Sequence, residues 1–266
     1  MGTRRLGCAL AGLVALCCVA SGCSSSRSAS GEGLSTTTAT ATAPETSSLV
    51  ALGDSVPRGT NCHCAPYPPL TADGLTASSG RTVTAANDAV AGATTSTVLR
   101  QLESDGAVIG RVRRADVIEI EIGANDVAYN SECGTAVDCY ATEIPKIRKN
   151  LDEIVARVHA LTAGHEALVV LLDYWSVWLG GKYAAAKGEA YVAAAEQVTD
   201  DVNSVIESTA ARSRSAYVDL RAAFKGPDYA YDETHYLAPD GDHPNAAGHK
   251  QIATAAEAVI EKTLHI

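Results

Sequence analysis

Short apolar runs alternate with longer segments of helical periodicity from residue 49 to the end of the 266-residue chain. The apolar runs predict five strands, at Leu49–Leu52, Thr82–Ala86, Val117–Ile122, Ala167–Leu172 and Ala216–Leu220. Apolar residues at helical spacing predict helices over Thr95–Ser104, Ile144–Leu161, Tyr183–Ala211 and Ala246–Leu264. Such alternation is typical of a parallel sheet with helices on both faces. We therefore expect one α/β domain over residues 48–266, a three-layer α/β/α sandwich around a five-stranded parallel sheet.

The third predicted strand contains two glutamates, Glu119 and Glu121, between its isoleucines. A central parallel strand is normally apolar on both faces. We therefore expect the two carboxylates to contact Lys or Arg from a covering helix, or this part of the sheet to be open to water.

The first 22 residues have the features of an export signal. Arg4 and Arg5 precede the mostly apolar run Leu6–Ala20, which is shorter than the roughly 20 residues that span a bilayer. The small residues Ala20–Gly22 before Cys23 resemble a bacterial lipobox, in which the cysteine becomes a lipid-modified N-terminus. We expect an exported lipoprotein that is anchored through Cys23 to the extracytoplasmic face of the cell membrane. Simple cleavage and secretion is the alternative.

Residues 23–47 are predicted to be the lipidated cysteine followed by a disordered linker, because Ser, Thr, Ala, Gly, Pro and Glu dominate this segment. Loss of residues 1–22 removes two of the 21 basic residues and none of the 31 acidic ones, which leaves a net charge of −12. A surface of this charge repels nucleic acid. We expect a monomer with no nucleic-acid partner.

Four cysteines lie in the predicted domain: Cys62, Cys64, Cys133 and Cys139. Outside the cytoplasm an even number of cysteines favours disulfides. Cys133 and Cys139 would close a short loop, which leaves the cramped pair Cys62 and Cys64, so crossed pairs remain open. A zinc site with His63 between two thiols is the other interpretation, although the spacing lacks the usual C-x2-C.

Ser55 follows the first predicted strand within Gly53–Asp54–Ser55, at the edge of the sheet where ligands bind in such folds. A serine hydroxyl becomes a nucleophile when a base takes its proton. His243 is the candidate base, because it lies just before the last predicted helix and its loop can reach the same edge. Asp240 is the preferred carboxylate to orient His243, since a turn over three residues brings it back to the ring, and Asp242 is the alternative.

An ester-cleaving serine also needs hydrogen-bond donors for the oxyanion that its attack creates. Gly92, after the second strand, can present a backbone N–H, and the side-chain amide of Asn125, after the third, can donate as well. No step of this chemistry requires a metal or a cofactor.

These segments, in order, resemble the sequence blocks of the SGNH (GDSL) hydrolase family. The blocks here are Gly53–Ser55, a glycine loop at Gly92, Gly123–Asp126 and Asp240–Pro244, and the resemblance extends over residues 49–266. It implies a flavodoxin-like sheet and a serine esterase. By resemblance, Ser55 is the nucleophile and the first oxyanion donor, Gly92 and Asn125 are the other donors, His243 is the base and Asp240 orients it.

Tyr174, Trp175 and Trp178 follow the fourth predicted strand and are candidates for contact with a sugar ring or an acyl chain, or for a simple hydrophobic cover. His235 and His249 are expected to be surface or capping residues. The expected substrates are short-chain esters of glycans, glycolipids or small molecules. Transfer of the acyl group to a sugar hydroxyl is the alternative reaction, and a non-catalytic binding lipoprotein is the alternative from another class.

Overall fold

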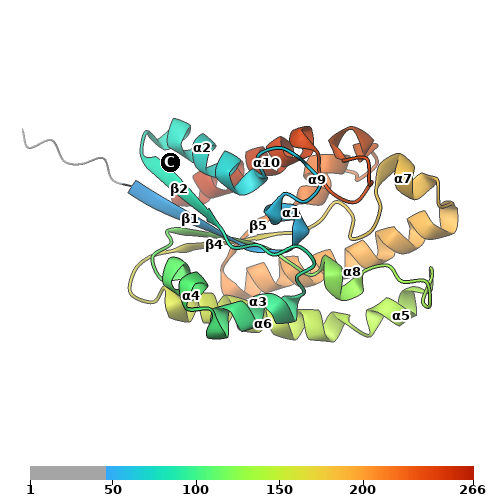
Figure 1. Ribbon diagram of the computed structural model, residues 1–266, viewed down its shortest axis with the longest axis horizontal. Coiled ribbons are helices and arrows are strands. Elements are labelled where there is room, and N and C mark those ends of the chain that lie inside the picture. The colour runs from blue at the N-terminus through green and yellow to red at the C-terminus, as the bar shows by residue number, and fades with distance from the viewer. Residues whose placement is uncertain (1–45) are drawn as a thin grey trace, which may run out of the picture. The chain divides into compact units, whose positions relative to one another are not determined.

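Five parallel strands form the centre of the structure, a computed structural model that describes residues 46–266. Their spatial order is β2-β1-β3-β4-β5, as Figure 1 shows. The strands are β1 (Thr46–Gly53), β2 (Thr82–Asn87), β3 (Val117–Glu121), β4 (Leu168–Leu172) and β5 (Ala216–Val218). All five lie where the sequence predicts strands, and the predicted parallel α/β fold is confirmed. Cys23 and most of the predicted linker lie outside the described residues.

Helices cover both faces of the sheet (Figure 1). Helices α2 (Tyr67–Ser79) and α10 (Ala246–Leu264) pack together on one face, whereas α3 (Thr95–Ser104), α6 (Ile144–Leu161) and α8 (Glu189–Ser213) pack on the other. Shorter helices lie between them: α1 (Ser55–Arg58), α4 (Gly106–Val112), α5 (Val137–Ala141), α7 (Gly181–Ala185), α9 (Leu220–Lys225) and the 3₁₀ turns η1 (Ala124–Val127) and η2 (Glu233–Tyr236). Among the helices of residues 46–266, none combines the length and apolar character needed to cross a membrane.

Three of the four predicted helices have the predicted bounds, because their apolar positions at helical spacing are the buried ones. The fourth prediction, Tyr183–Ala211, is wrong as a single helix. It divides into α7 and α8 at Gly188, whose φ of 96° is incompatible with a continuous right-handed helix. Helix α2 was not predicted; it has Pro68 and Pro69 in its first turn, where proline is tolerated.

The apolar strands are buried on both faces, as expected of a central parallel sheet. In β1, Leu49, Ala51 and Leu52 are completely buried, and in β4 Val170 to Leu172 are as well. Removing side chains of this size from water contributes roughly 1.5–3 kcal/mol each. The core therefore holds the carboxyl ends of the strands rigidly, and these ends carry the candidate site.

The two glutamates of β3 are the exception to this apolar core. Glu119 and Glu121 are both completely buried, so the expectation of Lys or Arg partners or of an open sheet is wrong. Their carboxyl oxygens form no hydrogen bond of ordinary geometry within residues 46–266, although the hydroxyls of Thr71 and Tyr67 in α2 lie near Glu119 and Glu121, respectively. Burial raises the pKa of Glu119 to about 8 and raises that of Glu121 as well. The physical reason is desolvation, which favours the neutral acid over the ion.

Replacement of Glu119 by Gln is expected to flatten the pH dependence of stability. Folded Glu119 keeps its proton up to about pH 8, whereas the unfolded residue releases it near pH 4.5, so stability falls as pH rises between these values. One such group contributes about 1.4 kcal/mol per pH unit to the free energy of unfolding in this range. Urea unfolding at several pH values measures the slope, and the exposed control Glu132→Gln should leave it unchanged. Equal slopes for Glu119→Gln and the original protein would contradict the prediction.

Candidate active site

Ser55 lies at the carboxyl end of β1, where the chain turns sharply into α1. The turn depends on Gly53, which has a φ of 151°, and a Cβ there would collide with the carbonyl oxygen of Glu121 on the neighbouring strand. The N–H of Asp54 donates to that same carbonyl at 3.3 Å. Ser55 is the first residue of α1, so its backbone N–H has no partner within the helix. The serine therefore presents both its hydroxyl and its N–H at the edge of the sheet.

The buried side chain of Asp54 stabilises this turn through hydrogen bonds. It is 1% exposed, and its carboxylate accepts hydrogen bonds from the Val56 N–H at 3.0 Å and from the Tyr174 hydroxyl at 2.7 Å. Burial raises the pKa of Asp54 to about 6, although both hydrogen bonds oppose the shift. These contacts attach the start of α1 to the loop that follows β4.

His243 lies in the loop before α10, and its ring contacts Asp240. The His243 Nδ1 is 2.8 Å from one carboxylate oxygen of Asp240, and the His243 backbone N–H donates to the other at 3.1 Å. Asp242, the alternative partner, is farther from Nδ1, at 3.8 Å. Two residues later, Asn245 accepts hydrogen bonds from the first N–H groups of α10, which fixes the end of the loop. The turn that the sequence predicts between Asp240 and His243 is therefore present.

Asp240 has a further partner that the sequence analysis missed. The side-chain amide of Asn61 donates to the Asp240 oxygen that faces the imidazole, at 2.5 Å. Burial alone would raise the pKa of Asp240, but hydrogen bonds from Asn61 and His243 lower it to about 2. Asp240 is thus ionised across the neutral pH range. Asn61 has a φ of 60°, a conformation that asparagine tolerates better than most residues, but a single sequence does not show which distant loop it contacts.

Ser55 and His243 line the same cavity, which has a volume of about 360 Å³. The Ser55 hydroxyl forms no hydrogen bond with the described part of the chain. Ser55 and His243 are therefore not hydrogen-bonded to each other in this structure. Hydrogen bonds of this kind often tighten only around a reacting substrate. The structure brings the two residues into one cavity from opposite ends of the domain.

The two loops predicted to supply further oxyanion donors meet beside this cavity. Asn125 lines it and donates one side-chain N–H to the carbonyl of Ala93 at 3.0 Å, which leaves a second N–H free to donate. Gly92 does not line the cavity, but it directly precedes Ala93. Its φ of 75° favours glycine, whereas a Cβ there would meet nothing within 4 Å. The backbone conformation, not lack of space, therefore explains the glycine.

Asp126 holds the second of these loops in place. Its carboxylate accepts hydrogen bonds from both the N–H and the hydroxyl of Thr95, at 2.8 and 2.7 Å. Thr95 is completely buried at the start of α3. The loop after β3 is therefore attached to the helix that follows β2.

Tyr174, Trp175 and Trp178 all line the cavity but are only 1–3% exposed. Each is occupied by protein contacts: the Tyr174 hydroxyl bonds to Asp54, Trp175 stacks on Phe224 at 4.3 Å, and the Trp178 indole donates to the Val127 carbonyl at 2.8 Å. Their main visible role is to build the wall. Several further lining residues were not predicted, among them Tyr129, Lys187 and Tyr191, because their loop and helix positions carry no local signal.

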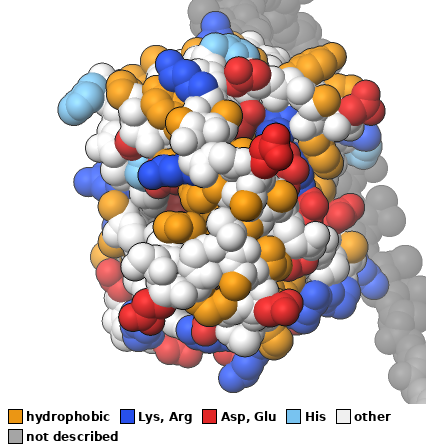
Figure 2. Space-filling view, turned by 90° about the vertical axis from the view of Figure 1, so that its right-hand side faces the viewer, with side chains coloured by type: hydrophobic (Ala, Val, Ile, Leu, Met, Phe, Trp, Pro, Cys, Tyr) orange, Lys and Arg blue, Asp and Glu red, His pale blue; other side chains and the backbone are white. Residues whose placement is uncertain are grey.

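Figure 2 looks at the end of the molecule toward which the strands point. Hydrophobic side chains gather near the middle of this face, and acidic and basic side chains surround them. Tyr129 is 46% exposed, and its ring packs edge-to-face with the Trp178 ring, with the ring centroids 5.2 Å apart. An apolar opening of this kind suits the acyl part of an ester.

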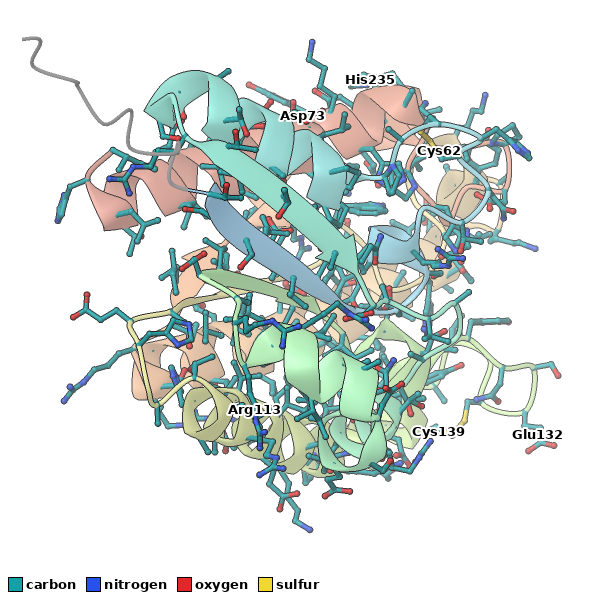
Figure 3. All side chains as sticks on the ribbon, turned by 60° about the vertical axis from the view of Figure 1, so that its left-hand side comes forward. Cys62, Asp73, Arg113, Glu132, Cys139 and His235 are labelled. Carbon is teal, nitrogen blue, oxygen red and sulfur yellow. A yellow bond between two sulfur atoms is a disulfide. The ribbon has the colours of Figure 1, made fainter. Side chains whose placement is uncertain are left out.

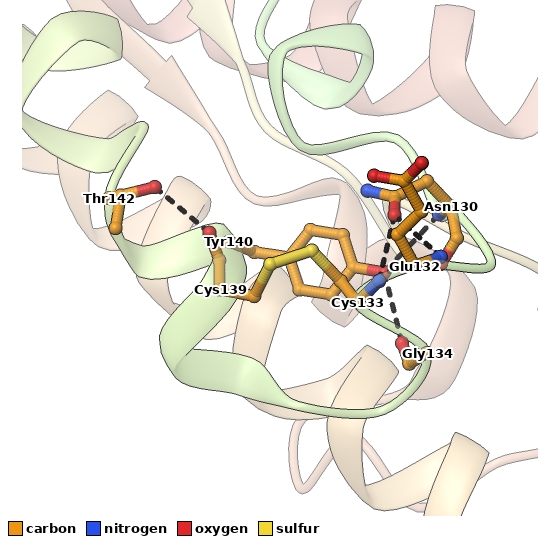
Figure 4. Close-up of a disulfide and its surroundings, with 7 residues drawn as sticks. All are labelled: Asn130, Glu132, Cys133, Gly134, Cys139, Tyr140 and Thr142. Atoms are coloured by element: carbon orange, nitrogen blue, oxygen red, sulfur yellow. Dashed lines mark hydrogen bonds between the residues drawn. A yellow bond between two sulfur atoms is a disulfide. The ribbon is translucent and has the colours of Figure 1, made fainter.

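Both pairs of cysteines form disulfides, Cys62 with Cys64 and Cys133 with Cys139, so the crossed pairs are not formed. Figure 4 shows the second disulfide and the hydrogen bond from the Tyr140 hydroxyl to the Gly134 carbonyl, 2.9 Å long. The Tyr140 ring also packs edge-to-face with the Trp178 ring, with the ring centroids 4.8 Å apart. This disulfide loop is therefore attached to the cavity wall.

The two other histidines near His243 in the sequence, His235 and His249, differ from each other. His235 is exposed and contacts the Tyr236 ring, in agreement with a surface position. His249 is completely buried in the first turn of α10, so its predicted surface or capping position is wrong. Burial, together with the nearby His243, lowers the pKa of His249 to about 4.

Comparison with known proteins agrees with this geometry. Residues 51–251 match the model of the GDSL-like lipase/acylhydrolase family. No curated protein sequence matches the chain significantly. Among solved structures, a phospholipase A1 from Streptomyces albidoflavus is similar with 25% identity and a TM-score of 0.60, over 83% of this chain and 99% of that one.

Two further solved structures show how widely the fold is shared. An extracellular lipase from Streptomyces rimosus has 24% identity and a TM-score of 0.60, and the similarity covers 81% of this chain and 99% of the lipase. An acetyl-xylooligosaccharide esterase from Geobacillus has 21% identity and a TM-score of 0.53, with 80% and 94% covered. The family match spans most of the described residues and includes every loop of the candidate site. The chain belongs to the GDSL-like lipase/acylhydrolase family and is a carboxylic ester hydrolase.

Proposed function

We propose that Ser55, His243 and Asp240 hydrolyse a carboxylic ester through an acyl-enzyme. The observation that carries this proposal is the shared cavity of Ser55 and His243, together with the 2.8 Å contact between the His243 ring and Asp240. The hydrogen bond to Asp240 leaves the other ring nitrogen of His243 available to take a proton.

In the proposed reaction, the Ser55 oxygen attacks the acyl carbon while His243 takes the hydroxyl proton. The N–H of Ser55 and the amide of Asn125, which both line the cavity, donate to the oxyanion. The N–H of Gly92, outside the cavity lining but next to the Ala93 carbonyl that Asn125 contacts, is proposed as the third donor. Protonated His243 then gives its proton to the departing alcohol. Water repeats the sequence on the acyl-enzyme and releases the acid.

We further propose that the substrates carry short acyl groups, on glycans, glycolipids or small alcohols. The cavity of about 360 Å³ lies near the lower end of the range for ligand sites, and buried aromatic side chains line it. The activities named for the similar structures, a phospholipase, a lipase and an acetyl esterase, all act on ester bonds. Transfer of the acyl group to a sugar hydroxyl would use the same acyl-enzyme and is the alternative outcome of the experiment below.

The predicted export signal and Cys23 support a location outside the cytoplasm. We propose that the enzyme acts as a monomer at the extracytoplasmic face of the membrane, held by lipid on Cys23 and by the linker that follows. Two or more acyl chains on the cysteine would give stable attachment. The net charge of −12 after cleavage argues against a nucleic-acid partner.

A series of nitrophenyl esters of increasing acyl length is expected to give the highest kcat/KM with short chains. Ser55→Ala should lose nearly all activity and all labelling by a fluorophosphonate, because the nucleophile is gone. Added alcohols should not divert the acyl group if water is the acceptor, whereas efficient ester synthesis would show a transferase. A maximum at long chains, or labelling of Ser55→Ala, would contradict the proposal.

Asp240→Asn and Asp242→Asn form a matched pair that tests which carboxylate orients the histidine. Asp240→Asn is expected to lower kcat roughly 100-fold or more with little change in KM, because it removes the charge beside the imidazole. Asp242→Asn should change kcat less than about threefold, since its carboxylate is 3.8 Å from Nδ1. Steady-state kinetics at neutral pH separate the two, and a larger loss in Asp242→Asn would reverse the assignment.

The membrane anchor is tested by Cys23→Ala in a bacterial host that processes lipoproteins. The original chain should incorporate labelled fatty acid and sediment with membranes until detergent is added, whereas Cys23→Ala should incorporate none. Cys18→Ala, which alters a cysteine inside the apolar run, is the control and should still be acylated. Acylation of the Cys23→Ala variant would refute the anchor.

A further inference from the structure

Cys62, Cys64 and His249 form a second cluster of reactive side chains, outside the cavity of the candidate active site. The two cysteines lie in the loop between α1 and α2, where Figure 3 labels Cys62, and His249 lies in the first turn of α10. One potential ligand atom from each residue lies within 4.8 Å of the other two. Within residues 46–266, it is the one place where three or more side chains of the kinds that bind metals lie this close together.

His249 has no visible structural reason to be polar. It is completely buried, and neither ring nitrogen has a hydrogen-bond partner within the described residues. A buried polar atom without a partner is costly and therefore rare in folded proteins. The ring packs against Tyr67, with centroids 6.4 Å apart, and a ring nitrogen lies near both sulfur atoms. A ligand bound to that nitrogen would satisfy it.

The Cys62–Cys64 disulfide contributes little to stability. In the chain-entropy account, a disulfide stabilises more when it closes a longer loop, and this one spans a sequence separation of 2, against 6 for Cys133–Cys139. The pair is also half-buried rather than enclosed, so a reductant can reach it. A purely stabilising role therefore leaves the pair unexplained.

We propose that the reduced Cys62 and Cys64 form, together with His249, a site for a thiophilic metal ion, Zn²⁺ or Cu⁺. Thiolate and imidazole are the ligands that these ions prefer. Three protein ligands leave one position of a tetrahedral zinc ion for water, and zinc distances of about 2.3 Å to sulfur and 2.0 Å to nitrogen place ligand atoms roughly 3.5–3.8 Å apart. The ligand atoms of the cluster lie within 4.8 Å of one another, so binding of the ion requires the two sulfur atoms to separate and the histidine nitrogen to lie closer to them. His63, the ligand considered from the sequence, is exposed and not part of the cluster.

Metal binding first requires reduction of the Cys62–Cys64 disulfide, and an external dithiol is the reductant. The dithiol gives two electrons and two protons to the Cys62–Cys64 bond and becomes a disulfide, and each cysteine becomes a thiol. Binding of the ion then releases both thiol protons to water, and His249 provides the lone pair of one ring nitrogen. Metal binding at this site does not depend on the roles proposed for Ser55 and His243.

The experiment titrates the purified mature protein, without residues 1–22, with Co²⁺ as a spectroscopic probe for Zn²⁺, after reduction with a phosphine and removal of oxygen. Reduced protein should bind one equivalent, with sulfur-to-cobalt charge-transfer absorption and tetrahedral visible bands, whereas the oxidised protein should show neither. A parallel titration with Cu⁺ against a chromophoric chelator identifies the preferred ion. Because the oxidised and reduced proteins share one sequence, this comparison does not depend on how variants fold.

Three variants locate the site. His249→Gln should weaken binding by at least about tenfold, since one of three ligands is lost, and Cys62→Ser with Cys64→Ser should abolish it. Cys133→Ser with Cys139→Ser is the matched control, because that pair has no histidine beside it among the described residues, and it should bind like the original protein. Circular dichroism checks the fold of each variant. Absence of both Co²⁺ and Cu⁺ binding by the reduced protein, or binding lost with the Cys133 and Cys139 pair, would overturn the proposal.

Discussion

The backbone contact between Gly53 and Glu121 is the constraint on which the candidate site depends. Strands β1 and β3 lie close enough here that any side chain at position 53 would collide with the Glu121 carbonyl. That carbonyl instead accepts the N–H of Asp54, so the turn into α1 begins directly from the sheet. The position of Ser55 therefore follows from the pairing of two central strands, not from a flexible loop.

The strands and the principal helices could be predicted because burial on both faces leaves an apolar pattern in the sequence. The break at Gly188 could not, since an isolated glycine in a helical pattern is often tolerated and only its φ of 96° identifies the break. The order of strands in the sheet was likewise restricted to a few possibilities by right-handed crossovers, and the resemblance to a family implied the one observed.

For the site, local signals located the residues that lie directly after strands. The turn joining Asp240 to His243 could be inferred because its two ends are three residues apart. The contact from Asn61 to Asp240 could not, because it joins two loops that are distant in the sequence and depends on how both are folded. The burial of His249 could not be predicted for the same reason. The residue belongs to α10, but the residues that cover it, Tyr67 among them, come from distant parts of the sequence.

Buried acids are a consistent feature of the region under the site. Asp54, Glu121 and Asp173 are each at most 1% exposed, and burial raises the pKa of all three. From the sequence, Glu121 and its neighbour Glu119 were expected to be ions that need a cation or water beside them. Desolvation instead favours the protonated form of Glu121 and, in part, of Asp173, whose pKa is about 7, whereas Asp54, with a pKa of about 6, is mostly ionised at pH 7. The negative formal charge of the chain therefore overstates the charge that this part of the folded protein carries near neutral pH.

The hydrogen bond from Asn125 to the Ala93 carbonyl has a consequence for how the two donor loops respond to change. Together with the hydrogen bonds between Asp126 and Thr95, it connects the segments after β2 and β3, so that a shift of one segment also moves the other. Free-energy effects of substitutions in the two segments should therefore not be additive, and a double-mutant cycle would assign them a shared interaction energy. Evolution of substrate preference in this enzyme would then favour paired changes across both segments over independent changes in either one.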